Sequence, residues 1–168
     1  MHRPLPFKLK YKTPETLGLD RIALAAAAAH DYPGKNCLVI DAGTCLTYDF
    51  IDRERNYHGG AIAPGLKMRY QALHHFTARL PLVAHRAEVE LIGDSTETSI
   101  QAGVAGGIFY EVKATIEAYQ MRYPGLITVL TGGDYAAFEG LSKNGIFAAP
   151  EFLLHGLNNI LEYYAEVL

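Results

Sequence analysis

The fold of this chain is decided by residues 36–65, which read NCLVIDAGTCLTYDFIDRERNYHGGAIAPG. The apolar run at 36–40 predicts a buried strand, and residues 45–51 alternate apolar and polar side chains as a second strand does. After a polar turn, residues 57–63 predict a third strand that is weakened by two glycines. The stretch therefore predicts a β-meander whose first turn is residues 41–44.

Helical patterns lie on both sides of this meander. Asp20 sits near the start of an alanine-rich helix, where the helix dipole favours an acid. Asp94 and Glu97 predict a capped start for a long helix, and its glycines at 103, 106 and 107 predict close approach by another helix or backbone. The remaining expected elements are a helix over 66–80 ended by Pro81, a strand over 126–130, a short helix over 134–138, and an amphipathic helix from Pro150 onward.

Composition indicates an ordinary soluble globular protein with one domain over residues 1–168. Hydrophobic residues make up 49% and charged residues 20% of the chain. The net charge is −3, without clustered Lys or Arg, which argues against nucleic acid as a partner. No signal peptide is visible and no apolar run is long enough to span a bilayer, so we expect a cytoplasmic protein with no membrane partner.

The two cysteines, Cys37 and Cys45, flank the first turn of the meander. A disulfide between them is possible. Because their surroundings indicate buried strand, free thiols in a reducing compartment are the favoured interpretation.

Two glycine-containing motifs follow predicted strands and suit phosphate or nucleotide binding. In Asp41-Ala42-Gly43-Thr44, Gly43 lets backbone amides approach a phosphate, Thr44 adds a hydroxyl, and Asp41 would hold a cation. In Thr131-Gly132-Gly133, the two glycines let a nucleotide lie on bare backbone at a strand end. Each motif taken alone also fits a plain turn or a tight strand-to-helix connection.

Two further motifs suit the binding of an acceptor substrate. Gly18-Leu19-Asp20-Arg21 places a carboxylate that could act as a general base beside a guanidinium that could grip an anion. Residues 59–65, with glycines and a proline around one strand, could form a floor on which a substrate packs. The alternatives are a solvated helix start and a bulged strand followed by a turn.

Together these motifs resemble the type III pantothenate kinases, the first-step enzymes of coenzyme A biosynthesis in many bacteria. The matching segments span nearly the whole chain in the family's order: residues 11–21, 39–44, 59–65, 93–103 and 131–133. The resemblance implies an α/β, ribonuclease H-like fold, the superfold of actin, Hsp70 and sugar kinases. It also implies phosphorylation of pantothenate by ATP with Mg²⁺ and a monovalent cation, K⁺ or NH₄⁺.

Site residues follow from the same resemblance. Asp20 would be the proton acceptor, and Asp41 would ligate the monovalent cation, with Asp94 and Asp49 left open as alternative ligands. The residues implied to contact pantothenate are Tyr11, Gly18, Leu19, Asp20, Arg21 and Thr96, and those implied to bind ATP are Gly43, Thr44, Gly132 and Gly133. Family members are dimers with the substrate site near the subunit interface, so we expect a homodimer, with the glycine-rich face of the long helix as its seam.

One departure from the family pattern is large. The family begins with a strand and an Asp-x-Gly-Asn-Thr-x-x-Lys loop that holds the nucleotide phosphates, and no such motif occurs here. We therefore expect the chain to correspond to the middle and C-terminal part of a type III pantothenate kinase, without its first lobe. Phosphoryl transfer depends on several positioned groups at once, so this chain alone should show little or no kinase activity.

Two alternatives to this interpretation remain. One is a non-catalytic relative that binds a small molecule or regulates a partner protein. The other is a different kinase of the same superfold, for which the match over residues 11–21 would be coincidental.

Overall fold

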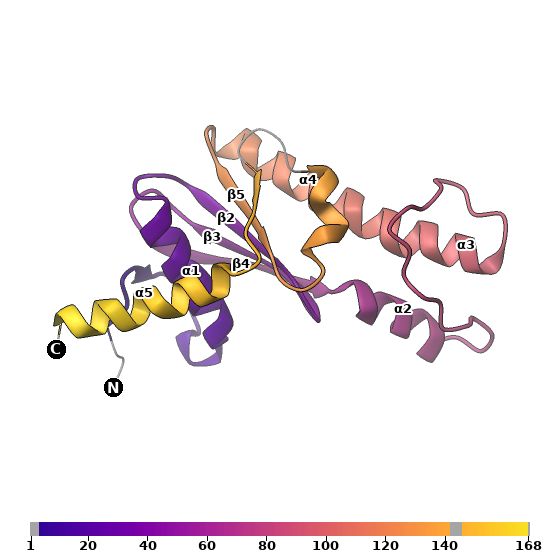
Figure 1. The fold of residues 1–168 in the computed structure, drawn as a ribbon, viewed down its shortest axis with the longest axis horizontal. Helices are drawn as coiled ribbons and strands as arrows, with labels where there is room; N and C mark the ends of the chain where they lie inside the picture. Colours follow the sequence, from indigo (N-terminus) through magenta and orange to yellow (C-terminus); the bar gives the residue numbers. More distant parts are fainter. Residues whose placement is uncertain (1–3, 142–145, 168) are drawn as a thin grey trace.

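A six-stranded mixed sheet forms the body of the protein, and a helical arm extends from one side of it (Figure 1). The computed structural model describes residues 4–141 and 146–167. The strands lie in the order β1-β4-β3-β2-β5-β6. Their bounds are Lys8–Leu9 (β1), Cys37–Ala42 (β2), Cys45–Ile51 (β3), Asn56–Pro64 (β4), Ile127–Thr131 (β5) and Ile146–Ala148 (β6).

The predicted meander is confirmed, because β2, β3 and β4 pair as consecutive antiparallel strands. On its other side β2 pairs with β5 in parallel, so that Asp41 and Thr131 are neighbours at the ends of their strands. The predicted α/β fold class is confirmed as well. The short strands β1 and β6 were not predicted, since two or three residues at a sheet edge carry no periodic signal.

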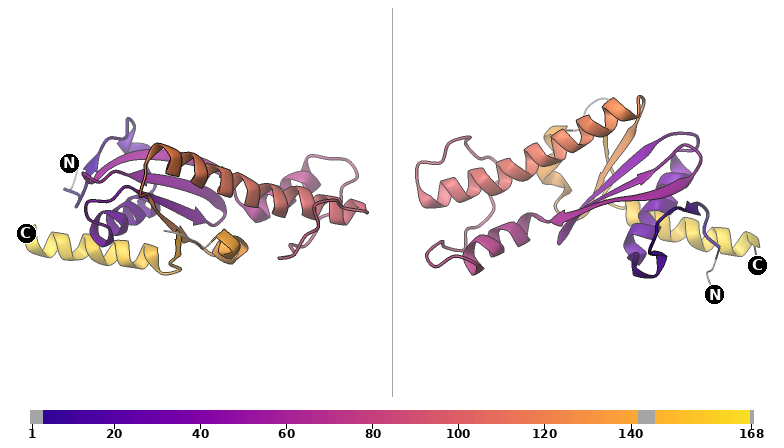
Figure 2. Two further views of the ribbon diagram at one scale, coloured as in Figure 1. Left: turned by 90° about the horizontal axis from the view of Figure 1, so that it is seen from above. Right: turned by 180° about the vertical axis from the view of Figure 1, so that it is seen from behind.

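Helices cover both faces of the sheet, as the two views of Figure 2 show. Their bounds are Leu19–Asp31 (α1), Leu66–His75 (α2), Thr96–Gln101 (α3), Gly107–Arg122 (α4) and Phe152–Val167 (α5), with short 3-10 helices at Pro14–Thr16 and Tyr135–Leu141. The alanines of α1 pack with Val39, Ile51 and Phe152 on one face. On the other face, α4 packs against Leu46, Tyr48 and Phe50.

The alternation predicted for β3 is therefore present, but its polar side is buried too. Thr47 and Asp49 point toward α1, and Asp49 is 0% exposed. A carboxylate without access to water requires partners, because burial of an unpaired charge is costly.

The arm differs from the predicted helices at two points. α2 ends at His75 instead of Leu80. Beyond this end the Thr77 hydroxyl donates to the Leu73 carbonyl oxygen at 2.7 Å, a side-chain bond that competes with the helical backbone ladder. The predicted capping pair of Asp94 and Glu97 is also wrong, because Ser95 and Thr98 form the capping box of α3.

The long helix predicted over 95–121 is present as α3 and α4, joined by a π-helical turn at Ala102–Gly106. Its glycines are not closely approached within the chain as predicted. A Cβ atom added to Gly103 or Gly107 would meet no atom within 4 Å. The small residues here therefore accompany a widened helical turn, a feature that often marks functional sites.

The predicted free thiols are confirmed, since Cys37 and Cys45 are unbridged. Within residues 4–141 and 146–167, no helix has both the length and the apolar character needed to cross a membrane.

Candidate active site

Three of the sequence motifs meet at the turn between β2 and β3. Within the turn, the Gly43 amide donates to the Cys45 carbonyl oxygen at 3.0 Å. The Gly65 amide donates to the Thr44 carbonyl oxygen at 3.1 Å, and the Asp134 amide donates to the Ala42 carbonyl oxygen at 2.8 Å. The turn is thus held from both sides, by the end of β4 and by the segment after β5.

Gly132 fits closely against this turn. Its φ of 92° lies in the region that favours glycine, and a Cβ atom there would overlap the Asp41 carboxylate and the Ala42 carbonyl oxygen. The glycine therefore permits β5 and the Asp41–Thr44 turn to lie in contact. Gly133 follows with open space above it, and Thr44 is exposed.

Asp20 lies in the first turn of α1, with an exposed side chain. The Arg21 amide donates to Asp20 Oδ1 at 2.8 Å. Gly18 is the N-cap residue and supplies no capping side chain, and Leu19 is 80% exposed. The Asp20 carboxylate is therefore oriented by the helix start and remains open to a substrate, as a general base requires.

Arg21 points the opposite way, into the body. Its Nε donates to Asp49 Oδ1 at 2.8 Å, and its Nη2 lies 2.7 Å from the same oxygen. The Tyr57 hydroxyl also donates to Asp49 Oδ1, at 2.6 Å, and the Thr47 hydroxyl donates to Oδ2 at 3.3 Å. The guanidinium expected to grip a substrate anion thus has a buried carboxylate as its partner in this chain.

Tyr11 lies beside this network and is partly buried. Its ring centroid is 6.0 Å from that of Tyr57, and Arg21 Cζ lies 5.8 Å from it. Gly59 of β4 has a φ of 90° and lies against the Tyr11 ring, since a Cβ atom added to it would be 2.8 Å from that ring. Gly59 therefore leaves room for the Tyr11 side chain.

The electrostatics of this region are dominated by carboxylates. Burial raises the pKa of Asp41, and the neighbouring Asp20 and Asp49 carboxylates raise it further. Burial also raises the pKa of Asp49, although the hydrogen bond from Arg21 lowers it in part. Arg21 is the cation that faces these carboxylates, so the region carries excess negative charge that a bound cation would offset.

Asp41 is the side chain of the Asp41–Thr44 turn that could ligate a cation. Across the part of the chain that the structure describes, no three His, Cys, Asp or Glu side chains lie close enough together to hold a metal ion. Asp41 could nevertheless contribute one carboxylate to a cation whose other ligands are carbonyl oxygens or phosphate. Mg²⁺ commonly enters kinase sites in this manner, with its nucleotide and few protein ligands.

Thr96 is far from the other predicted substrate-binding residues. It is the first residue of α3 and lies near the outer end of the arm, whereas α1 lies in the body; Figures 1 and 2 agree on this. One copy of the chain therefore does not bring Thr96 to Asp20.

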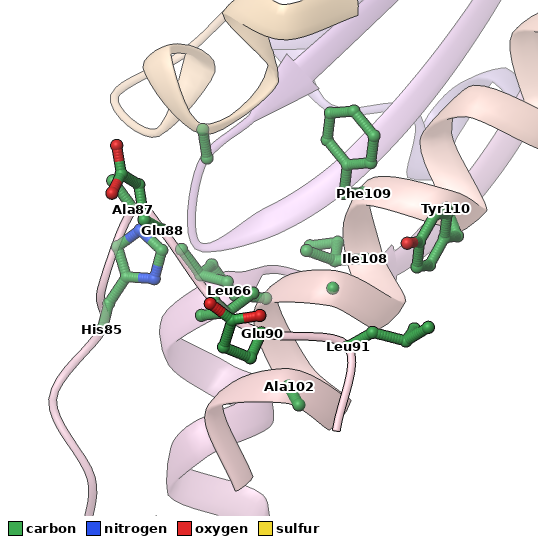
Figure 3. A pocket seen from close by; sticks show the side chains of 14 residues that line it. Leu66, His85, Ala87, Glu88, Glu90, Leu91, Ala102, Ile108, Phe109 and Tyr110 are labelled. Carbon is green, nitrogen blue, oxygen red and sulfur yellow. The ribbon is translucent and has the colours of Figure 1, made fainter. Parts of the chain in front are cut away.

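Two adjoining cavities open between the arm and the end of β5. The first, of about 320 Å³, lies between the loop that carries Glu88 and Glu90 and the α4 residues Ile108, Phe109 and Tyr110 (Figure 3). The second, of about 440 Å³, shares Leu66 with the first and is also lined by Asp134. Neither cavity is lined by Asp20. The two cavities therefore adjoin the Thr131–Gly133 motif and not the side of the turn that carries Asp20.

Tyr57 was missed as a neighbour of the site, and Asp49 was considered only as a cation ligand and not as the partner of Arg21. One signal was available, since Asp49 is an acid in the middle of a strand that is otherwise strongly apolar. Identifying its partner required knowledge that α1 crosses this face of the sheet, which no local pattern provides.

A crystal structure with a similar fold is that of a conserved putative Baf family transcriptional activator from Campylobacter jejuni. It superposes with a TM-score of 0.68 at 22% sequence identity, over 95% of this chain and 69% of that one. The sheet order and this likeness define an α/β protein with a mixed sheet covered by helices on both faces.

Sequence comparison specifies the family. The family model of type III pantothenate kinase matches residues 1–118. A type III pantothenate kinase from Christiangramia forsetii is 55% identical over 159 residues, which are 95% of this chain and 65% of that protein. A type III pantothenate kinase from Bacteroides fragilis is 52% identical over 162 residues, or 96% of this chain and 67% of that protein. The chain belongs to the type III pantothenate kinase family and spans about two thirds of the length of these relatives.

Proposed function

We propose that the chain acts in the ATP-dependent phosphorylation of pantothenate to 4'-phosphopantothenate, the first step of coenzyme A biosynthesis in the cytoplasm. One observation carries the proposal: the exposed Asp20 carboxylate is close enough to Asp41 to raise its pKa, and Asp41 begins a turn whose Ala42 carbonyl oxygen accepts from the Asp134 amide, directly after the glycine motif. A general base next to a phosphate-binding turn is what transfer of a phosphoryl group to a hydroxyl requires.

In this proposal the acceptor substrate, pantothenate, binds against the start of α1 and the Tyr11 ring. Asp20 takes the proton from the pantothenate hydroxyl as that oxygen attacks the γ-phosphorus of ATP, and the bond from this phosphorus to the β,γ-bridging oxygen breaks to release ADP. Gly18 and Leu19 border the acceptor at the helix start, and the Tyr11 ring packs against it. Arg21 supports the first turn of α1 from below, and because its guanidinium pairs with Asp49 it offers the acceptor no free charge.

The nucleotide occupies the other side of the same turn. Gly43 and Thr44 contact phosphate, and Gly132 and Gly133 border the nucleoside near the cavities beside Asp134. Asp41 contributes to a K⁺ or NH₄⁺ site, where the cation offsets the surrounding carboxylates. ATP brings Mg²⁺ bound to its phosphates.

The distant position of Thr96 supports a homodimer. If Thr96 contacts pantothenate, it does so from the arm of a second copy, since its own α1 lies far away. The arm exposes large apolar side chains that suit such contacts: Phe76, Leu82, Leu91 and Ile92 are each more than half exposed. A chain that stays monomeric in light scattering would count against this assembly.

The test combines binding with slow turnover. Pantothenate is titrated into the chain by calorimetry, and 4'-phosphopantothenate formed with ATP and K⁺ is counted by mass spectrometry, so that a rate orders of magnitude below normal still registers. We expect Asp20→Asn to retain pantothenate binding and to lose any phosphorylation by about 10²-fold or more. Absence of pantothenate binding at millimolar concentration would favour a non-catalytic relative with another ligand.

A further inference from the structure

Asp49 is an unusual residue for its position. It is a carboxylate with no exposure to solvent, in the central part of β3, between Val39 of β2 and Gly60 of β4. Buried ion pairs seldom stabilise a fold more than apolar residues of the same size would, because both charges lose their hydration. Stability alone therefore does not explain why a charge is placed here.

The contacts of Asp49 point to another explanation. Asp49 Oδ1 accepts from Arg21 Nε at 2.8 Å and from the Tyr57 hydroxyl at 2.6 Å. Arg21 directly follows Asp20, and its amide donates to the Asp20 carboxylate. The Tyr57 ring in turn packs against Tyr11. Asp49 therefore bonds directly to Arg21, the residue after Asp20, and through Tyr57 it reaches the Tyr11 ring. Asp20 and Tyr11 are the residues that flank the proposed acceptor site.

The start of α1 has little else to fix it. Its N-cap, Gly18, makes no side-chain capping bond. N-terminal turns without a cap tend to fray, because their first amides lack partners. The bond from Arg21 to Asp49 joins this first turn to β3, and so fixes where the Asp20 carboxylate lies relative to the Asp41–Thr44 turn.

We propose that Asp49 is a positioning residue for the acceptor side: through Arg21 it holds the first turn of α1, and through Tyr57 it supports the Tyr11 ring. It does not touch the acceptor itself. The inference rests on the proposed function for its substrate, pantothenate, but its geometric part can be measured without substrate.

The geometric part is tested by hydrogen exchange of the Arg21 backbone amide, which reports the bond to Asp20 directly. Asp49→Asn keeps the size of the side chain and removes its charge. Ile51→Val is the matched control, since it weakens the same face of the same strand without contacting Arg21. We expect Asp49→Asn to lower protection of the Arg21 amide at least tenfold relative to amides elsewhere in α1, and Ile51→Val to leave that ratio unchanged.

The functional part is tested by pantothenate titration of the same three proteins. We expect Asp49→Asn to weaken binding at least tenfold and Ile51→Val to weaken it less than twofold, with both variants folded by circular dichroism. If the original chain binds pantothenate and Asp49→Asn binds it equally well with normal Arg21 protection, the positioning role is contradicted. If the original chain does not bind pantothenate, the proposed function fails, and the exchange ratio alone decides whether Asp49 holds the helix start.

Discussion

The body and the arm of this protein are built differently. In the body, Asp20, Arg21 and Tyr11 are tied to a fully buried carboxylate and to a sheet whose central residues have no solvent exposure. In the arm, Phe76, Leu91 and Ile92 are about four-fifths exposed, and two cavities separate the helices from their covering loop. The side chains of the body are thus held in one arrangement by their contacts. The arm instead exposes apolar side chains that another protein surface could cover.

The body and the arm are therefore suited to two different kinds of role. Groups that must hold one geometry, such as a general base, belong where packing and hydrogen bonds fix them. Groups that act on a partner belong on a projecting element, and Thr96 occupies such a place. Changes in the body should therefore alter folding stability strongly, and changes in the arm should alter assembly while leaving stability nearly unchanged.

The largest effect is expected from Arg21→Ala, which removes the partner of Asp49. A buried carboxylate left unpaired should lower the free energy of unfolding by about 3–5 kcal/mol at neutral pH. Urea denaturation followed by circular dichroism measures this value. A loss below about 1 kcal/mol would mean that the pair does not hold the body together.

The same variant should show a characteristic pH dependence. Without Arg21, the pKa of Asp49 rises further, because the hydrogen bond and the charge of Arg21 no longer lower it, although the bonds from Tyr57 and Thr47 remain. A raised folded-state pKa means that the penalty is absent below the ordinary carboxyl value of 3.8, grows as pH rises toward the folded-state pKa, and is constant above it. Arg21→Ala should therefore be closer in stability to the original chain in mild acid than at pH 8, and a penalty independent of pH would contradict this assignment.

Gly132→Ala should have the next largest effect. The alanine would adopt an unfavourable positive φ, and its Cβ would overlap Asp41 and Ala42, at an expected cost of about 1–3 kcal/mol. Gly133→Ala is the matched control, since its added Cβ meets nothing within 4 Å. Thermal melting of both variants should separate them, and equal melting temperatures would show that Gly132 is not tightly held.

A smaller effect is expected at the turn between β3 and β4. Asp52 accepts bonds from the Glu54 and Asn56 amides and pairs with His58, and these bonds outweigh partial burial to hold its pKa at about 2. Asp52→Ala should cost about 1 kcal/mol at neutral pH. Because the folded-state pKa is lowered, this cost should fade as pH falls from 3.8 toward 2, which acid titration of both proteins can establish.

The smallest effect on stability is expected in the arm. Ile92→Ser should change the free energy of unfolding by no more than about 0.5 kcal/mol, because the side chain is 82% exposed. The same change should shift a dimer toward monomer in sedimentation experiments. Met121→Ser replaces a residue that is 80% exposed at the body end of α4 and should leave the sedimentation unchanged.

Much of the body could be predicted from sequence, and less of the arm. The meander of residues 36–64 combines an apolar run at 36–40, an alternating strand at 45–51 and clear turns, so local pattern and tertiary structure agree. α2 was predicted too long, because a side-chain bond from Thr77 ends it without a change in apolar spacing. The motifs single out Asp20 and the Asp41–Thr44 turn as candidates, whose roles stay predictions, but the position of Asp49 depends on a long-range bond to Arg21 that no local signal encodes.

In the proposed function, the residues of the body that bind pantothenate are already in place before the substrate arrives. An NMR titration of the chain with pantothenate, read at every assigned backbone amide, tests this directly. We expect the shifted amides to cluster at Tyr11 and residues 18–21, and a second set near Thr96 to appear only if the chain dimerises. Shifts confined to the cavities of the arm, or no shifts at millimolar pantothenate, would contradict it.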